Sequence, residues 1–365
     1  MSQQTIVRWL DELTTADLPH VGGKLARLGA QKANGLRVPD GFAVPVQAFE
    51  LFLSNTARTD LELVLAQPAE GWDAGERVAT EARRVIESQA FPSDMEDAIS
   101  AAHDRLAERS GLRDKLQTAV RSSGVTEDGD EASFAGQFDT YLGIRGASEV
   151  LVHVRKCWAS QYTARALDYR RRRGLPLLTQ GIAVGVLQLV DARSAGVAFT
   201  LNPIDGNRDQ AVVEGNWGFG ESVVSGLCTP DHWVVDKKTG EIVEEVIAAK
   251  SMWSTFDAAA GRVIECAAPA GMAEQPCLTQ QEVLEIIAMA VAIEDQEGRP
   301  QDVEWTIAHH LPFPDNVFLL QHRPETVWTG REATPKQAPR PKVLDVLDAG
   351  MRGGGFSSDL LKGFR

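Results

Sequence analysis

Cysteine is scarce in this sequence of 365 residues. The four cysteines, Cys157, Cys228, Cys266 and Cys277, lie far apart along the chain. Zinc ribbons, redox pairs and disulfide frameworks need cysteines at short or regular spacings, so we expect none of them. Unpaired thiols are typical of a reducing compartment, and we expect a cytoplasmic protein.

Long apolar runs and positive charge are also missing. No apolar run approaches the ~20 residues that a membrane helix needs, and the segment Met1–Leu10 lacks the apolar core of a signal peptide. Only 37 Lys and Arg residues stand against 51 Asp and Glu residues, which gives a net charge of −14. These absences exclude a membrane or a nucleic acid as partner, and an anionic ligand must be held by a local cluster of cations. P-loop and protein-kinase signatures are absent as well.

Hydrophobic residues make up 43% of the chain, enough for a large core in two or three lobes. Apolar residues recur at helical spacing over 55–114, which predicts a helical insert, and over 148–174, which predicts one long helix. From residue 181 the pattern changes to buried strands, with a hairpin turning at Lys238–Gly240. A further helix is predicted over 279–297, with a capping box at its start. The pattern indicates an α+β protein with a helical first lobe and a sheet-rich second lobe.

The stretch Ala119–Leu142 has the composition of a loop that closes over phosphates. It combines one fixed positive charge, Arg121, with small, hydroxyl-bearing and glycine residues such as Gly136 and Thr140. An ordinary polar surface loop is the alternative.

A second cation, Lys24, follows a Gly-Gly pair where a helix is expected to begin. Because the dipole of a helix disfavours a lysine at its N-terminus, this placement indicates an anion nearby. A solvated surface lysine is the alternative.

Polar side chains alternate with apolar ones along the segments 302–307 and 317–324 near the end of the chain. Asp302, Glu304 and Thr306 are expected to share one face of the first strand. Leu319, Gln321 and Arg323 are expected to share one face of the second. If the strands are neighbours, carboxylates and an arginine converge, which suits Mg²⁺ bound to a nucleotide. A solvated face of an antiparallel pair is the alternative.

These stretches, with NWGFGESVVSG and TPDHWVVD, resemble the ATP-binding domain of the phosphoenolpyruvate synthase and pyruvate phosphate dikinase family, which includes rifamycin phosphotransferase. The resemblance spans about Val21–Val327 and implies an ATP-grasp-type fold in which two lobes clamp ATP. The expected divisions are a first lobe at 1–185 with the insert 55–114 and the loop 119–142, a second lobe at 186–328, and a linker and docking tail at 329–365.

The resemblance implies that Lys24, Arg121 and Arg323 contact the ATP phosphates as catalytic cations, and that Glu304 and Gln321 hold Mg²⁺. Where the family has a glutamine in its adenine-lining strand, this sequence has Leu187, and its glutamine comes one position later. Adenine recognition is therefore expected from backbone atoms of the next residues. The full set of implied ligand residues is Lys24, Arg121, Gly136, Thr140, Gln188, Leu189, Val190, Glu304, Gln321 and Arg323.

Single-chain members of the family continue into a swivelling domain with a phosphate-carrying histidine. None of the seven histidines here lies in the family's Gly-x-Ser-His setting. The resemblance therefore implies one subunit of a split phosphotransferase, which converts ATP to AMP and phosphate and phosphorylates a histidine on a partner subunit. The chain is most similar to the smaller, ATP-binding subunit of phenylphosphate synthase, which implies phenol as an acceptor bound by the partner. A phosphoenolpyruvate synthase-like or rifamycin phosphotransferase-like component with another acceptor, a carboxylate-activating ligase and a non-catalytic nucleotide sensor stay open as alternatives.

Overall fold

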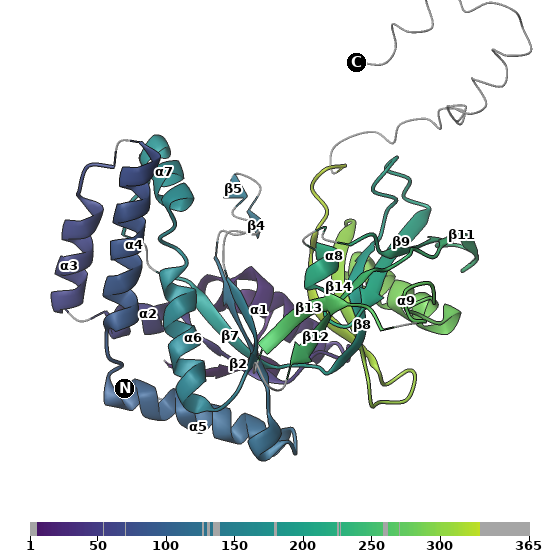
Figure 1. The fold of residues 1–365 in the computed structure, drawn as a ribbon, viewed down its shortest axis with the longest axis horizontal. Coiled ribbons are helices and arrows are strands. Elements are labelled where there is room, and N and C mark those ends of the chain that lie inside the picture. The colour runs from purple at the N-terminus through teal and green to yellow at the C-terminus, as the bar shows by residue number, and fades with distance from the viewer. Residues whose placement is uncertain are drawn as a thin grey trace, which may run out of the picture.

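The computed structural model describes residues 6–53, 55–69, 71–125, 128–129, 132–133, 139–178, 181–224, 226, 228–257, 262–269 and 271–328. Two sheets with their helices form two lobes, which lie on the left and on the right in Figure 1. Gly136 and the predicted tail at 329–365 lie outside the described residues. None of the described helices combines the length and the apolar character that crossing a membrane requires.

The first lobe is built on a five-stranded antiparallel sheet with the order β1-β2-β7-β3-β6. Its strands are β1 (Arg8–Trp9), β2 (Gly41–Val44), β7 (Ala183–Gln188), β3 (Thr118–Ser123) and β6 (Thr140–Ile144). The chain also forms two short strands, β4 (Asp128–Gly129) and β5 (Ala132–Ser133), and three 3₁₀ turns, η2 (Leu10–Glu12), η3 (Thr15–Asp17) and η4 (Arg113–Lys115).

Helices cover this sheet, and the predicted helical insert is present as three of them, α3, α4 and α5. The helices of the lobe are α1 (Leu18–Ala33), α2 (Val46–Phe52), α3 (Asn55–Leu65), α4 (Trp72–Ser88), α5 (Ser93–Arg109), α6 (Ala147–Ala159) and α7 (Ala164–Arg173). Trp158 on α6 packs against Phe49 and Phe52 on α2, with ring centroids 5.5 and 4.8 Å away. This aromatic cluster fixes α2 and α6 to each other within the core of the lobe.

Two expectations for this lobe need correction. The long helix expected over 148–174 is two helices, because Tyr162 turns into the core and Thr163 caps a new helix by accepting a hydrogen bond from the Ala166 N–H (3.1 Å). The strand β7, expected to begin the second lobe, lies between β2 and β3 in the first sheet. The first sheet therefore extends to Gln188, beyond the expected division after residue 185.

The second lobe is built on a six-stranded antiparallel sheet with the order β11-β10-β9-β8-β14-β15. Its strands are β8 (Ala192–Phe199), β9 (Gln210–Trp217), β10 (Asp231–Asp236), β11 (Ile242–Val246), β14 (Gln301–Ala308) and β15 (Val317–Pro324). The predicted hairpin turn at Lys238–Gly240 joins β10 to β11.

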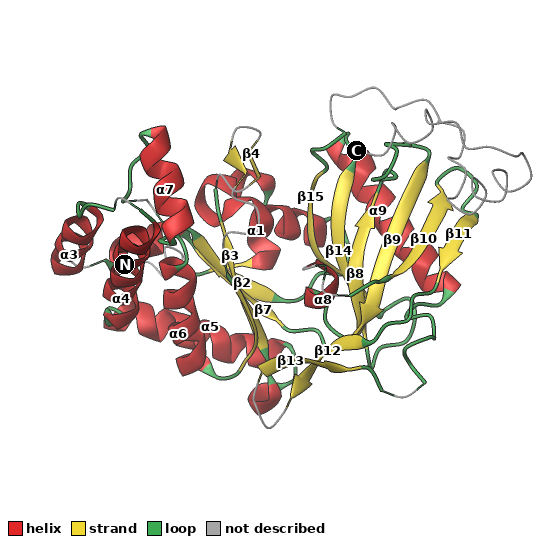
Figure 2. Cartoon of the chain, turned by 45° about the horizontal axis from the view of Figure 1, so that its top comes forward, coloured by secondary structure: helices red, strands yellow, loops and turns green. Residues whose placement is uncertain are grey.

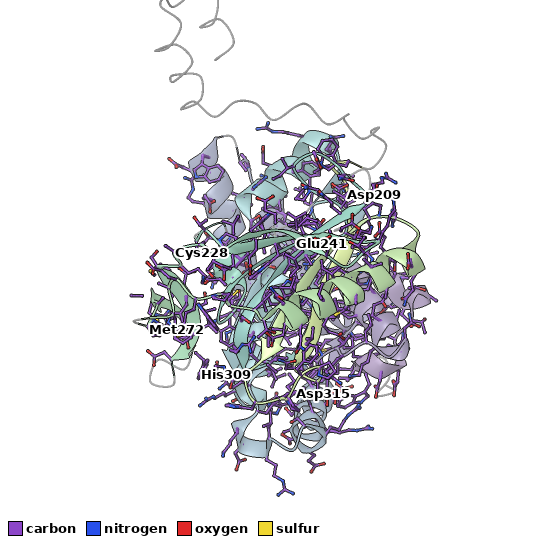
Figure 3. All side chains as sticks on the ribbon, turned by 90° about the vertical axis from the view of Figure 1, so that its right-hand side faces the viewer. Asp209, Cys228, Glu241, Met272, His309 and Asp315 are labelled. Atoms are coloured by element: carbon purple, nitrogen blue, oxygen red, sulfur yellow. The ribbon has the colours of Figure 1, made fainter. Side chains whose placement is uncertain are left out.

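One face of the second sheet is covered by α9 (Gln280–Glu297), which buries Val283, Ile286 and Ala290 against it. The predicted capping box is present, since the Thr279 hydroxyl and the Glu282 carboxylate each accept a hydrogen bond from the other residue's backbone N–H. Figure 3 shows this lobe from the side of α9, with Asp315 and Asp209 near opposite ends of the lobe. The other face of the sheet carries the short helix α8 (Glu221–Val224).

The strands β14 and β15 are antiparallel neighbours, as the alternation predicted. A bulge near Glu304 pairs Glu304 with Gln321 but Trp305 with Leu319, so Leu320 is the extra residue of β15. Leu319 therefore faces the core under α9, and only Gln321 and Arg323 share the opposite face with Glu304. The expectation that Leu319 lies on that polar face was wrong.

A two-stranded hairpin of β12 (Met252–Asp257) and β13 (Arg262–Ala267) connects the lobes. Figure 2 shows it at the side of the molecule where the two sheets approach each other. The hairpin is attached to the second lobe where the Phe219 N–H donates to the Ser254 carbonyl (3.0 Å). Its Phe256 ring lies against β6, because a Cβ on Gly143 would stand 2.5 Å from that ring and the Arg145 guanidinium stacks over it at 4.8 Å.

Candidate active site

A cavity of about 210 Å³ opens on the face of the second sheet that α9 leaves uncovered. Two carboxylates from β14, an amide and a guanidinium from β15, and a third carboxylate from β9 line it, together with apolar side chains. The lining residues are Val197, Phe199, Glu214, Val223, Asp302, Val303, Glu304, Gln321 and Arg323.

The polar lining follows from the register of the strands. Glu304 pairs with Gln321 on one side and with Val197 on the other, and Val197 pairs with Glu214. The four residues form one transverse row across β15, β14, β8 and β9, with their side chains on the same face. The small Val197 side chain leaves the space above it open between the two glutamates.

Arg121 of the first lobe reaches this row from β3. Its guanidinium donates from Nη1 to the Leu320 carbonyl (3.1 Å) and from Nη2 to the Gln321 side-chain oxygen. The residue is 9% exposed, and its Nε has no hydrogen-bond partner among the described residues. A buried guanidinium N–H without an acceptor is costly, so the site has capacity for one more acceptor atom, such as a phosphate oxygen.

Lys24 is held close to the same strand. Gly22 at the start of α1 has a φ of +74°, and this kink lets the Leu25 N–H donate to the Ser123 hydroxyl (3.3 Å). The Gly23 N–H donates to the Gly124 carbonyl (3.2 Å). Lys24 therefore lies beside the end of β3, the strand that carries Arg121.

Thr140, the first residue of β6, is the cross-strand partner of Arg121 and is exposed. It lies where the predicted phosphate loop returns to the sheet. Of the residues expected from the first lobe, the structure thus brings Lys24, Arg121 and Thr140 together.

Asp302 lines the cavity beside Glu304, as the alternation along 302–307 indicated, although the resemblance did not include it among the implied ligand residues. Burial raises the pKa of its carboxyl group to about 6, in spite of the nearby Arg323. Arg323 Nε donates to Asp302 Oδ2 (3.2 Å), while Oδ1 is buried without a partner among the described residues. A bound cation would satisfy this oxygen and favour the ionised form.

The donor set of the cavity fits Mg²⁺. Asp302 and Glu304 offer carboxylate oxygens and Gln321 an amide oxygen, the hard donors that this ion prefers. Within the described ranges no group of three or more His, Cys, Asp or Glu side chains could enclose a metal ion by itself. Mg²⁺ is commonly held by one or two carboxylates with substrate phosphates completing the shell, and the cavity suits that arrangement.

The expected adenine contacts lie away from this cavity. Gln188 is the last residue of β7, Leu189 and Val190 follow it, and none of the three lines the cavity. The Leu189 N–H donates to the Gln117 carbonyl (2.8 Å), and the Gln188 N–H donates to the Asp40 carbonyl (2.7 Å). These two N–H groups are occupied within the first lobe, so an adenine would need other backbone atoms of this segment.

Sequence reasoning missed Glu214 and its partner His232. His232 on β10 is the cross-strand partner of Glu214, and its Nδ1 lies 3.1 Å from Glu214 Oε1. The hydrogen bond to Glu214 raises the pKa of the His232 imidazole. The alternation along each strand indicates which side chains share a face, but only the register between β9 and β10 shows that these two meet.

Comparisons with known proteins agree with this geometry. Residues 18–343 match the family described as the AMP/ATP-binding domain of pyruvate phosphate dikinase. The chain is 38% identical to a probable phosphoenolpyruvate synthase of Staphylothermus marinus, over 93% of the chain and 44% of that protein. It is 34% identical to the phosphoenolpyruvate synthase of Pyrococcus furiosus, over 94% of the chain and 46% of that protein.

A third relative is named as a phosphotransferase that acts on rifampicin. The chain is 37% identical to a rifampicin phosphotransferase of Streptomyces sviceus, over 87% of the chain and 35% of that protein. The chain thus spans less than half the length of these three relatives. Their shared region is the ATP-binding one, with its ATP-grasp-like architecture.

Proposed function

Because the chain belongs to the family of the AMP/ATP-binding domain of pyruvate phosphate dikinase, we propose that it binds MgATP between its lobes and drives dikinase-type phosphoryl transfer. ATP would yield AMP and inorganic phosphate, with one phosphoryl group passing to a histidine on a separate polypeptide. The observation that carries the proposal is Arg121 of the first lobe meeting Gln321 of the second, beside Glu304 and Arg323.

The positively charged side chains of both lobes would bind the phosphates. Lys24 and Arg121 would approach the triphosphate from the first lobe and Arg323 from the second, which holds the phosphates in line. Arg121 is the best fixed of these cations, since two of its nitrogens are anchored on β15 and its Nε is left to donate to a phosphate oxygen. Thr140 would add a hydroxyl donor at the root of the closing loop.

Asp302, Glu304 and Gln321 would hold Mg²⁺ against the phosphates. Bound there, the ion would supply positive charge that stabilises the transferring group. The chain's own part is to orient oxygen donors from two adjacent strands, which their pairing fixes.

The acceptor histidine is proposed outside this chain. All seven histidines fall within the described residues, and none lines the cavity. His232 contacts the lining residue Glu214, whose carboxylate engages its Nδ1. A partner with a mobile phosphohistidine domain would then carry the phosphoryl group to the final acceptor.

Phenol is the acceptor we propose, on the resemblance to the smaller subunit of phenylphosphate synthase. The relatives named as phosphoenolpyruvate synthases and as a rifampicin phosphotransferase support two other acceptors, pyruvate and a rifamycin. Each acceptor would be bound by the partner.

The test is a turnover assay with ATP labelled in its β-phosphate and candidate histidine-bearing partners. The proposal predicts AMP, phosphate and acid-labile label on a partner histidine, and no labelling with the Glu304→Gln variant. ADP with an acyl phosphate would indicate a carboxylate-activating ligase instead. Nucleotide binding without turnover under any pairing would indicate a sensor.

A further inference from the structure

The strands of the second sheet give the cavity a direction. The segment expected to hold the adenine base, residues 189–190, comes just before β8, whereas Val197, the partner of Glu304, lies near the end of that strand. A nucleotide with its base at the start of β8 and its phosphates at Val197 therefore extends along the strand. Figure 3 labels His309 near the end of the lobe where β8 begins and Asp209 near the end where β8 finishes.

The proposed reaction determines the side from which the acceptor approaches. An unprotonated imidazole nitrogen bonds to the β-phosphorus as the bond from that phosphorus to the AMP oxygen breaks, and water then releases the outer phosphate. In an in-line displacement the attacking atom stands opposite the leaving group. Because AMP is the leaving group, the imidazole must reach the phosphates from the end of β8 that lies farther from the base.

Two segments that continue from strands of the cavity meet at that end of the sheet. One is the loop 200–209, which follows β8 directly, and the other is the segment 325–328, which follows β15. The Trp328 indole N–H donates to the Pro203 carbonyl (3.0 Å), and a Cβ on Gly206 would stand 2.7 Å from the Trp328 ring. We call these two segments the outer rim.

The outer rim exposes two apolar side chains. Ile204 is 78% exposed, the largest fraction for any large hydrophobic side chain of the described residues, and Val327 is 61% exposed. Their chain neighbours Pro203 and Trp328 are in contact, so the two side chains belong to one surface. The Asn202 side-chain oxygen accepts a hydrogen bond from the Ile204 N–H (3.0 Å), which fixes the backbone that carries Ile204. Exposed apolar side chains gathered at one place are typical of a protein-binding surface.

The charges between the cavity and the outer rim suit an anionic product. Arg323 pairs with Asp302 across the sheet beside the outer rim, and its side chain is 45% exposed although its Nε donates to Asp302. Arg208 in the loop is exposed, while Asp209 beside it is paired with Lys238 (2.8 Å). A phosphorylated imidazole is negatively charged, so the guanidinium groups complement it as it leaves the cavity.

We propose that the outer rim is the surface on which the histidine-bearing domain of the partner docks to accept the phosphoryl group, with Ile204 and Val327 as its apolar contacts; this inference rests on the proposed function. The partner surface that fits carries apolar side chains around its histidine, because these replace the water on Ile204 and Val327. Docking there brings the imidazole to the phosphates from the side opposite AMP.

The test is the dependence of labelling on partner concentration, measured with the full chain, ATP labelled in its β-phosphate and the histidine-bearing partner that the turnover assay identifies. Ile204→Ser and Val327→Ser should each raise the partner concentration for half-maximal labelling roughly 10-fold or more. The labelling rate at saturating partner and the affinity for ATP should stay unchanged. Leu63→Ser removes a side chain of similar exposure (64%) from α3 in the first lobe and is the matched control.

Photo-crosslinking tests the contact itself. With p-benzoylphenylalanine in place of Ile204, the chain should cross-link to the histidine-bearing domain of the partner. The same replacement of Leu63 should give no cross-link. Equal unfolding temperatures of the variants would show that the fold is intact.

The two proposals fail differently. If wild type labels no partner, the proposed function is wrong and this inference is wrong with it. If wild type labels a partner but the Ile204→Ser and Val327→Ser variants need no more of it, only the docking surface is overturned. An equal loss in Leu63→Ser, or a cross-link from position 63 and none from position 204, would likewise overturn it. So would a lower ATP affinity of the two rim variants, because the rim would then act on the nucleotide.

Discussion

The first and second lobes contribute to the cavity through different kinds of support. In the second lobe, the polar side chains stand on adjacent strands of one sheet, and the pairing of Glu304 with Gln321 sets their spacing. In the first lobe, Arg121 extends from β3 to the other sheet, and Lys24 depends on a kink at Gly22. The second lobe presents a fixed surface, whereas the first lobe brings charge to it.

This difference has a consequence for catalysis. Phosphoryl transfer requires that the phosphates be positioned and that their charge be neutralised. The second lobe would position them, and the first lobe would add the neutralising charge. Changes in the first lobe should therefore affect the rate more than binding. Changes in the second lobe should lower the stability of the sheet that carries the ligand-binding side chains.

The largest expected effect is that of Arg121→Ala. Loss of the cation that bridges the lobes should lower the rate of phosphoryl transfer by about 10³-fold or more, with a much smaller loss of ATP affinity. Single-turnover labelling of the partner histidine, with ATP binding measured in parallel, checks this. The matched control is Arg165→Ala, which removes an exposed arginine from α7. Equal losses in rate and affinity would show that Arg121 merely binds ATP.

The second expected effect concerns the rigidity of the second lobe. Lys250 and Asp231 form an ion pair of 2.6 Å with both side chains fully buried, and Asp231 also accepts from the Ala248 and Cys277 N–H groups. Lys250→Met leaves a buried carboxylate without its cation, which should cost on the order of 3 kcal/mol in the free energy of unfolding.

Denaturant unfolding of the Lys250→Met variant measures that cost. Lys238→Met, at the exposed hairpin turn, is the control and should leave stability essentially unchanged, because its ion pair with Asp209 is exposed to solvent. Adding Asp231→Asn to Lys250→Met should recover part of the loss. An unaltered stability of Lys250→Met would contradict the importance of the pair for the lobe.

A smaller effect is expected at the contact between the lobes. Phe256→Ala removes the ring that lies against Gly143 and under the Arg145 guanidinium. The loss of packing and of the cation–π contact should lower stability by about 1–2 kcal/mol. Phe256→Tyr keeps the ring and should stay within about 0.5 kcal/mol of wild type. A double-mutant cycle with Arg145→Ala that yields no coupling would refute the contact.

The smallest effect is a pH dependence at the start of α9. Burial by itself would raise the pKa of the Glu282 carboxyl, but the Arg193 ion pair (2.7 Å) and hydrogen bonds from Thr279 and Asn316 together lower it below the usual 4.5. A carboxyl group with a lowered pKa adds stability above its unfolded pKa and loses it as the pH falls through the folded value.

Wild type should therefore exceed Glu282→Gln in unfolding temperature at pH 7, and the difference should shrink below about pH 4.5. Thermal unfolding of both proteins between pH 3 and 8 measures it. A difference that stays constant over this range would mean that the charge of Glu282 does not stabilise α9. Glu285→Gln, one turn along the same helix, is the control for loss of charge.

The polar face of the site was predictable because two strands carry an uninterrupted alternation of polar and apolar residues. Asp302 and Glu304 could be assigned to one face, and Gln321 and Arg323 to one face of their neighbour. The bulge at Leu320 was not predictable, since nothing in the local sequence marks it. The packing of the core under α9 decides on which face of β15 Leu319 lies.

The remaining differences also have physical causes. Thr163 is a favourable N-cap residue, and it could have indicated that the segment 148–174 forms two helices instead of one. The pairing of β7 with β2 and β3, and the meeting of Glu214 with His232, depend on contacts between distant segments. No periodicity within one segment encodes such contacts.

The most direct test of the central claim is the position of the triphosphate in a crystal structure with Mg²⁺ and a non-hydrolysable ATP analogue. We predict phosphate oxygens within hydrogen-bond distance of Arg121 and Arg323, with the ion on Glu304. A nucleotide bound elsewhere, with the cavity empty and no phosphate oxygen near Arg121 Nε, would contradict the account.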